Sequence, residues 1–307
     1  MIKGGICGIK GVFFFIPLIV MNDNLDNQLI VKSNRLIEAS YRLTLNEQRI
    51  ILLAISRVRR DRELQLDDVF EVHASDLVSY FGVDPKTSYS ELIDVSKTLF
   101  NRHVTLENPY PNDPRVKTLL TRWVSSIAYL PEHGCIRLRF SQDVLPFLSL
   151  LETQFTRYKL EVVGKMTSIY AVRLYELLIQ WGSVGKREIE IEWLKQRFQI
   201  EDKYPAIKDL KKYVIDIAVA QINQHSDMIV TYTQRKTGRV VSHLIFAFEL
   251  KKSVAPKKTK SLKAKKNVDV SAPETIFGVL KADIEKLARP GESYEDAASR
   301  IKKMNLS

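Results

Sequence analysis

The segment that decides the fold is Trp193-Leu194-Lys195-Gln196-Arg197-Phe198-Gln199-Ile200, because the chain contains a second copy of its pattern. The counterpart is Asp76-Leu77-Val78-Ser79-Tyr80-Phe81-Gly82-Val83, in which Leu77, Phe81 and Val83 match Leu194, Phe198 and Ile200 at one constant offset. Apolar residues four apart lie on one face of a helix. The match therefore predicts a short amphipathic helix that occurs twice in the chain.

A longer helix with a buried face precedes each copy. Apolar residues recur there at i, i+3, i+4 and i+7, the spacing of one helix face. These residues are Ile51, Ala54, Ile55 and Val58 in the first half and Leu174, Leu177, Leu178 and Trp181 in the second. We expect both helices to pack against the core of a domain.

A proline and then another helix follow each short helix. Pro85 and Pro205 stand near the start of predicted helices over 89–101 and 205–223, which fits the preference of proline for the first helical turn. Strand-like, β-branched segments come next, at 102–107, 117–130 and 135–140 in the first half and at 227–233 and 239–250 in the second. This order is that of a winged helix. The sequence thus predicts an α+β chain with two tandem winged-helix domains.

The second half carries the stronger signs of DNA binding. In a winged helix the third helix enters the major groove and the hairpin wing contacts the backbone or the minor groove. The predicted inward stripe of this helix is Ile207, Leu210, Val214 and Ile217, which leaves several lysines facing outward, and the wing tip adds three cations around Gly238. The predicted DNA-binding residues are Lys203, Tyr204, Lys208, Lys211, Lys212, Arg235, Lys236 and Arg239. An ordinary solvated lysine face is the alternative, which the basic wing tip disfavours.

The first half is less persuasive on charge. Its predicted third helix includes the acidic residues Glu91 and Asp94 beside its basic and hydroxyl residues. Hydroxyl groups and loop arginines would contact phosphates rather than bases. The candidate DNA-binding residues are Lys86, Ser88, Ser90, Arg115, Lys117 and Arg122. A dimerisation module is the alternative interpretation of this half.

Net charge favours a polyanionic partner but is unevenly distributed. Lys and Arg number 47 and Asp and Glu 36, which gives +11, so nucleic acid is expected before an anionic membrane. Residues after Leu250 carry +7 of this charge, mostly in eight lysines between 251 and 266. We predict a flexible, lysine-rich linker over 251–272, acting as a solvated tether or a non-specific phosphate binder, and a short helical tail over 273–307. Ile276, Val279 and Leu280 lie on the expected helical stripe of this tail.

Residues 1–30 form a predicted N-terminal extension. The apolar run over 11–20 is too short to span a bilayer as a helix, and small residues suited to a signal-peptidase site do not follow it. We expect translation to begin at Met21, with residues 1–20 upstream of the natural start; export or membrane anchoring is the alternative. The two cysteines, Cys7 and Cys135, cannot build a disulfide framework, which favours a reducing cytosol.

Sequence motifs of catalysis and metal binding are missing. Gly182-Ser183-Val184-Gly185-Lys186-Arg187 has the wrong glycine spacing for a phosphate-binding loop and no Ser or Thr after the lysine. The five histidines never fall two apart, so the paired-histidine metal site of a strand-nicking endonuclease is not present, and neither Gly-x-Ser-x-Gly nor Cys-x-x-Cys occurs. We therefore predict a non-enzymatic protein with no catalytic residue, metal or cofactor.

Several long motifs in register resemble the theta-type plasmid replication initiators, the Rep_3 family. They are FTRYKL (155–160), SIYAVRLYELL (168–178), DLKKYVI (209–215) and AQIN (220–223), with NRLIEASY (34–41), LNEQR (45–49) and RWVSSI (122–127) in the first half. The resemblance runs from about Val31 to Leu250. It implies a first winged helix over 31–150 for DNA binding and dimerisation, and a second over 151–250 as the main reader of DNA.

The resemblance also implies a function. Such a protein would bind directly repeated iterons at a plasmid origin as a monomer, promote opening of adjacent AT-rich DNA and helicase loading, and repress its own promoter as a dimer on an inverted repeat. Double-stranded DNA, the host replication initiator, the replicative helicase and chaperones are the expected partners, with no membrane, in the bacterial cytoplasm. Alternatives are a winged-helix transcriptional repressor without an initiator role and a nicking-type replication enzyme.

Overall fold

The computed structural model describes residues 28–149, 151, 154–251, 275–276, 279–280 and 301. The chain divides into two compact units, Met1–Lys252 and Ser253–Ser307. The predicted N-terminal extension up to residue 27 and nearly all of the predicted linker lie outside the described residues. Among the described helices, none is long and apolar enough to cross a membrane.

The first winged helix is built on a three-stranded antiparallel sheet. In chain order its elements are α2 (Leu45–Ser56), β3 (Phe70–His73), α3 (Ala74–Phe81), α4 (Ser88–Leu99), β6 (Val124–Leu130) and β7 (Cys135–Phe140). The sheet order is β3-β7-β6, so the strand after the first helix pairs with the last strand of the unit. At the start of α2 the Thr44 Oγ accepts from the Glu47 amide while the Glu47 carboxylate accepts from the Thr44 amide. This capping box fixes the residue at which α2 begins.

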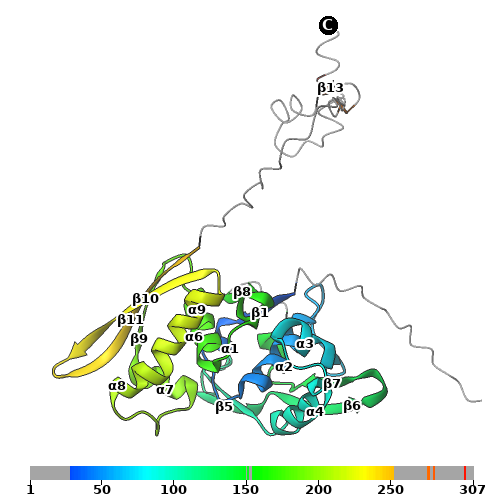
Figure 1. Ribbon diagram of the computed structural model, residues 1–307, viewed down its shortest axis with the longest axis horizontal. Helices are drawn as coiled ribbons and strands as arrows, with labels where there is room; N and C mark the ends of the chain where they lie inside the picture. Colours follow the sequence, from blue (N-terminus) through cyan, green and yellow to red (C-terminus); the bar gives the residue numbers. More distant parts are fainter. Residues whose placement is uncertain are drawn as a thin grey trace, which may run out of the picture. The chain divides into compact units, whose positions relative to one another are not determined.

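The second winged helix repeats this topology. Its elements are α6 (Ile169–Ile179), β9 (Lys186–Glu190), α7 (Ile191–Phe198), α8 (Ile207–Leu210), the π-helical turn η4 (Lys211–Ile215), α9 (Asp216–His225), β10 (Met228–Thr237) and β11 (Val240–Leu250). The sheet order is β10-β11-β9, again with the strand after the first helix paired to the last strand. Figure 1 shows the hairpin of β10 and β11 projecting away from these helices. The prediction of two tandem winged helices is confirmed.

Additional strands join the two winged helices within the first unit. They are β1 (Leu29–Ser33) with β8 (Phe155–Lys159), and β2 (Ser40–Tyr41) with β4 (His103–Glu107) and β5 (Thr118–Arg122). The short helices α1 (Asn34–Ile37) and α5 (Leu160–Gly164) and the 3₁₀ turns η2 (Pro131–His133) and η3 (Leu145–Phe147) complete this unit. Strands β1 and β8 pair across residue 150, where the sequence prediction separates the domains.

Cations of the second winged helix also reach the first. The Arg187 Nη2 lies 2.7 Å from the Glu38 Oε1, and the Arg197 Nη2 lies 2.5 Å from the Glu107 Oε2. The buried Arg173 donates to the backbone oxygen of Ala39 over 2.9 Å. Because each of these contacts joins residues far apart in the sequence, they fix the two winged helices against each other.

Three sequence predictions about local structure are wrong. The segment 117–130 was expected to be one strand, but it is split at Trp123, which is fully buried. The part before Trp123, β5, pairs with β4 in one sheet, and the part after it, β6, pairs with β7 in another. Trp181 follows the end of α6 and is 43% exposed, because the chain turns there toward β9. Ile217 is 41% exposed rather than buried. The π-helical turn before it inserts one extra residue, which shifts the inward face.

The described part of the second unit differs from the expected helical tail. Strands β12 (Thr275–Ile276) and β13 (Val279–Leu280) pair antiparallel, with Ile276 opposite Val279. The prediction of a helix over this stripe is therefore wrong at these residues. The β-branched residues Thr275, Ile276 and Val279 favour the paired strands. Ile301 is helical and buried.

Candidate DNA interface

The third helix of the second winged helix presents lysines on its exposed side. Leu210, Val214 and Ile215 are buried against the core, whereas Lys208 and Lys212 are exposed. Lys203 is exposed in the loop that precedes this helix. The structure thus places these predicted residues where a DNA duplex can reach them.

Lys211 connects this helix to the wing. Its Nζ donates to the Gln234 Oε1 over 3.3 Å and lies 5.5 Å from the centre of the Tyr232 ring. The Tyr232 hydroxyl donates to the Asp216 Oδ1 over 2.5 Å. Desolvation, together with this hydrogen bond to Asp216, raises the pKa of Tyr232, so the phenol stays protonated and keeps donating. Lys211 itself is half-buried. Its contacts with Gln234 and Tyr232 place it to hold the helix and the wing in one orientation.

Tyr204 anchors the loop before the helix. Its backbone φ is 54°, in the left-handed region, and its ring stacks on Tyr213 with centroids 6.1 Å apart. The Lys212 Nζ lies 4.9 Å from the centre of the same Tyr213 ring. A left-handed tyrosine is strained unless neighbouring contacts hold it. Tyr204 therefore positions the start of the helix, and its half-buried ring is only partly available to DNA.

The wing carries the remaining predicted cations. Gly238 sits at the tip with φ of 63°, which a residue with a side chain rarely adopts, and Lys236 and Arg239 flank it in exposed positions. The register shifts between Arg235 and Lys236, which re-aims the strand near its tip. Arg235 differs from the other two, because its Nε forms an ion pair with the Glu188 carboxylate.

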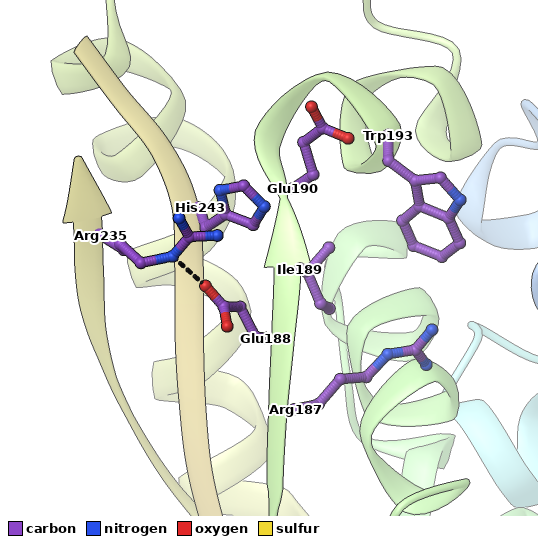
Figure 2. A pocket seen from close by; sticks show the side chains of 7 residues that line it. All are labelled: Arg187, Glu188, Ile189, Glu190, Trp193, Arg235 and His243. Carbon is purple, nitrogen blue, oxygen red and sulfur yellow. Dashed lines mark hydrogen bonds and ion pairs between the residues drawn. The ribbon is translucent and has the colours of Figure 1, made fainter. Parts of the chain in front are cut away.

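A shallow depression of about 370 Å³ surrounds that ion pair. Figure 2 shows that it follows β9 and the facing part of the wing. Its lining residues are Arg187, Glu188, Ile189, Glu190, Trp193, Arg235 and His243. Two carboxylates make this surface unfavourable for phosphate. The depression lies along β9, the edge strand of this sheet.

The structure does not bring the six candidates of the first half into one patch. The prediction that Ser88 contacts DNA is wrong, because its side chain is buried and its hydroxyl donates to the Pro85 oxygen over 3.0 Å. Lys86 and Ser90 are exposed near the start of α4, while the Arg122 guanidinium lies 5.3 Å from the centre of the Phe100 ring at the other end of that helix. Twelve helical residues span about 18 Å.

The other first-half candidates lie on a different hairpin from the wing. Arg115 and Lys117 belong to the connection between β4 and β5, and Arg115 is paired with Asp113 over 2.7 Å. The wing itself is the β6–β7 hairpin, whose tip over 131–134 includes Glu132 and His133. An acidic tip is poorly suited to phosphate contact. The charge evidence for DNA binding is therefore stronger in the second winged helix than in the first.

Sequence reasoning missed the apolar residues on the exposed side of the third helix in the second winged helix. Tyr213 is 47% and Ile217 41% exposed, and Ala220 is exposed one turn further on. A signal was present in the sequence: Ile215, Ala218 and Ile222 form a second helical stripe that overlaps the predicted one. The structure buries this second stripe from Ile215 onward.

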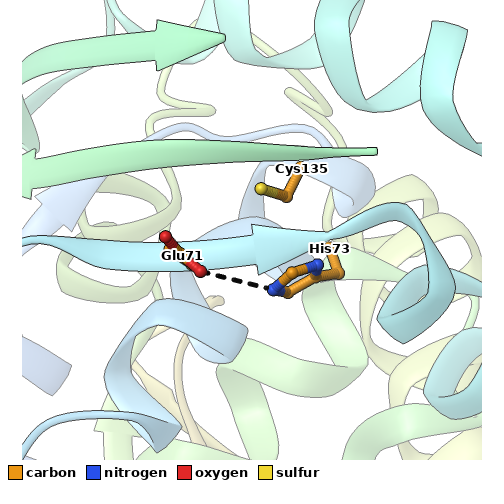
Figure 3. A group of neighbouring side chains, drawn as sticks. All are labelled: Glu71, His73 and Cys135. Atoms are coloured by element: carbon orange, nitrogen blue, oxygen red, sulfur yellow. Dashed lines mark ion pairs between the residues drawn. The ribbon is translucent and has the colours of Figure 1, made fainter. Parts of the chain in front are cut away.

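A second missed group is formed by Glu71, His73 and Cys135 on the paired strands β3 and β7 (Figure 3). Their possible ligand atoms lie within 4.8 Å of one another, and such N, O and S donors can bind zinc. However, the Glu71 Oε1 accepts from the Arg137 Nε over 2.7 Å, and burial raises the pKa of the Cys135 thiol. A paired carboxylate and a protonated thiol favour a structural cluster beside the tip of the first wing. The absence of a metal stays a prediction.

Two family models match adjacent segments of this chain. The model described as "Initiator Replication protein, WH1" matches residues 29–179, and that described as "Initiator Rep protein, WH2" matches residues 190–248. The chain belongs to the Rep_3 family of plasmid replication initiators. The resemblance inferred from the sequence motifs is thereby confirmed.

Relatives of this initiator agree with the assignment. The PI protein of Escherichia coli is 26% identical over 259 residues, which cover 75% of this chain and 85% of that protein. An uncharacterized 27.6 kDa protein of Escherichia coli is 26% identical over 236 residues, 73% of this chain and 98% of that one. The crystal structure of Pi initiator protein in complex with iteron DNA matches with a TM-score of 0.62 at 24% identity, over 73% of this chain and 97% of that chain. This likeness supports the two-winged-helix fold.

Proposed function

We propose that this initiator binds directly repeated iterons at a plasmid origin as a monomer. The observation that carries the proposal is the exposure of Lys208 and Lys212 on the third helix together with Lys236 and Arg239 on the wing of the same winged helix. A helix in the major groove and a wing on the backbone need cations at these two places. The solved complex of the Pi initiator with iteron DNA supports the choice of iterons as the target.

The second winged helix would supply most of the sequence preference. Its helix would read base edges, and neutralisation of phosphates by its lysines and arginines would supply much of the affinity, with strong salt dependence. The first winged helix would add phosphate contacts through its exposed candidates, such as Lys86 and Lys117. The polar contacts between the two winged helices would keep both on one duplex in a fixed spacing.

Replication would then start without catalysis by this chain. Binding of several monomers would promote opening of adjacent AT-rich DNA and loading of the replicative helicase, with the host initiator and chaperones as partners in the bacterial cytoplasm. A dimer would repress the promoter of its own gene. These roles rest on family membership.

Footprinting of the full chain on DNA flanking its gene tests the proposal. Protection of direct repeats of about two helical turns is expected, since each winged helix would occupy one major groove. The same DNA on a plasmid should be maintained only when the gene is supplied. A chain that protects only an inverted repeat and does not support maintenance would be a repressor. Relaxed product from supercoiled origin DNA and Mg²⁺ would instead indicate a nicking enzyme.

A further inference from the structure

The π-helical turn exchanges one core residue for another. In a regular helix Ile217 would follow Leu210 and Val214 on the inward face, at i+7 and i+3. With the extra residue in η4, Ile215 and Ala218 are buried instead and Ile217 is 41% exposed. The core keeps an isoleucine, and a second isoleucine is placed on the surface of the helix.

Ile217 belongs to a continuous exposed strip on that helix. Tyr213 lies four residues before it and Ala220 three residues after it, and both are exposed. Lys208 and Lys212 stand on the same exposed side. Single exposed apolar residues are ordinary, but a strip beside the lysines of a DNA-reading helix requires another explanation. π turns inside helices occur frequently at functional sites.

We propose that Tyr213, Ile217 and Ala220 read thymine methyl groups in the major groove, with Ile217 as the specificity-determining residue. The inference rests on the proposed function. The thymine C5-methyl is the apolar group on the base edges of the major groove. Against a polar base edge the aliphatic side chains of Ile217 and Ala220 would remove water from base donors or acceptors without replacing the lost hydrogen bonds, which is unfavourable. The strip therefore selects thymine at the positions that it covers.

Uracil scanning tests this inference, because deoxyuridine differs from thymidine only by that methyl group. The full chain is titrated with a duplex of one footprinted repeat, in which each thymine is replaced by deoxyuridine in turn. At one or more positions the wild-type chain should lose about 4-fold in affinity, the value of one buried carbon. Ile217→Ala should bind the thymine duplex more weakly and show no further loss with uracil at one of those positions.

The controls separate this inference from the proposed function. Ile229→Ala on β10 has similar exposure, 43%, and should keep the affinity and the uracil losses of the wild type. Ile217→Ala removes no charge and no residue of the buried core, so its salt dependence should match the wild type and its melting temperature should stay close to it, and Ile217→Val should recover part of the effect. Uracil losses that persist unchanged in Ile217→Ala would overturn the inference alone. A wild-type chain that prefers no repeat over scrambled DNA would overturn both.

Discussion

At the residue scale, Lys208 is the most direct test of the DNA interface. It is exposed in α8, on the side opposite the buried Leu210. Lys208→Ala should weaken binding to a repeat by about 1–3 kcal/mol and change the preference at one position if the ammonium binds a base edge. A contact to phosphate would instead weaken all sequences alike and lower the salt slope by about 1. Fluorescence anisotropy at several salt concentrations distinguishes these results.

A lysine outside the interface provides the matched control. Lys159 ends β8, and its Nζ lies 3.4 Å from the Glu161 Oε1. Lys159→Ala removes the same charge from the chain but should leave repeat binding near that of the wild type. Equal losses in both variants would show that only net charge matters, and no loss in Lys208→Ala would contradict the assigned docking.

Lys32 and Glu176 form a buried ion pair whose disruption should be costly. The Lys32 Nζ lies 2.6 Å from the Glu176 Oε1, both side chains are buried, and the Tyr158 hydroxyl donates to the same oxygen over 2.5 Å. Desolvation lowers the pKa of Lys32, although Glu176 opposes this effect. Glu176→Ala should reduce the free energy of unfolding by about 3–5 kcal/mol, because a charge is left buried without its partner.

The double variant separates charge from packing. Lys32→Met with Glu176→Leu removes both charges and keeps similar volumes, so most of the lost stability should return. Urea unfolding of the wild type, Glu176→Ala and the double variant gives the comparison. A double variant as unstable as the single one would show that the pair contributes through its shape and hydrogen bonds.

At the element scale, the repeated short helices share one C-terminal geometry. Helix α3 ends at Gly82 with φ of 66°, and α7 ends at the equivalent Gln199 with φ of 52°. Glycine adopts this conformation without strain, whereas a side chain costs about 1 kcal/mol or more. Gln199→Gly should therefore stabilise the protein by roughly 0.5 kcal/mol after the added chain entropy, and Gly82→Ala should destabilise it by roughly 0.5–1 kcal/mol.

Urea midpoints measure both changes, and Gln199→Ala is the control. Alanine and glutamine both have a Cβ at positive φ, so this variant should change little. The space around Gly82 would accept a Cβ, which leaves backbone conformation as the cause of any loss there. Equal stability of Gly82→Ala and the wild type would contradict the argument.

The order of elements could be predicted from the sequence, but their exact register could not. Helical spacing and the repeated anchors are local properties, so the two winged helices followed from them. The π-helical turn depends on whether Ile215 or Ile217 packs better in the core, which two overlapping stripes leave undecided. The burial of Ser88 and Trp123 and the pairing of Arg235 with Glu188 likewise arise from tertiary contacts.

At the scale of the whole molecule, the contacts between the winged helices were hidden from the sequence. Three arginines, Arg173, Arg187 and Arg197, are largely buried, and each bonds to the first winged helix. These arginines add to net charge without adding to the DNA interface. Counting charge therefore overstates the cations available to phosphate.

The charge of the molecule is divided between two tasks, and truncation separates them. Residues after Leu250 carry +7 of the net +11, whereas the predicted base-reading residues lie in the first unit, which ends at Lys252. A chain that ends at Lys252 should keep its preference for repeat over scrambled DNA but bind scrambled DNA more weakly and with a smaller salt slope, because fewer counterions are released.

A full-length variant with glutamine in place of the six lysines between 257 and 266, which truncation also removes, shows whether charge is responsible. It should match the truncated chain in salt slope, since both lack the same run of cations. If truncation left binding to scrambled DNA unchanged, this run would be a solvated tether. If it abolished the preference for the repeat, bases would be read by residues beyond the two winged helices. Sequence preference and non-specific affinity therefore belong to different parts of this initiator, and salt titration of these chains measures each separately.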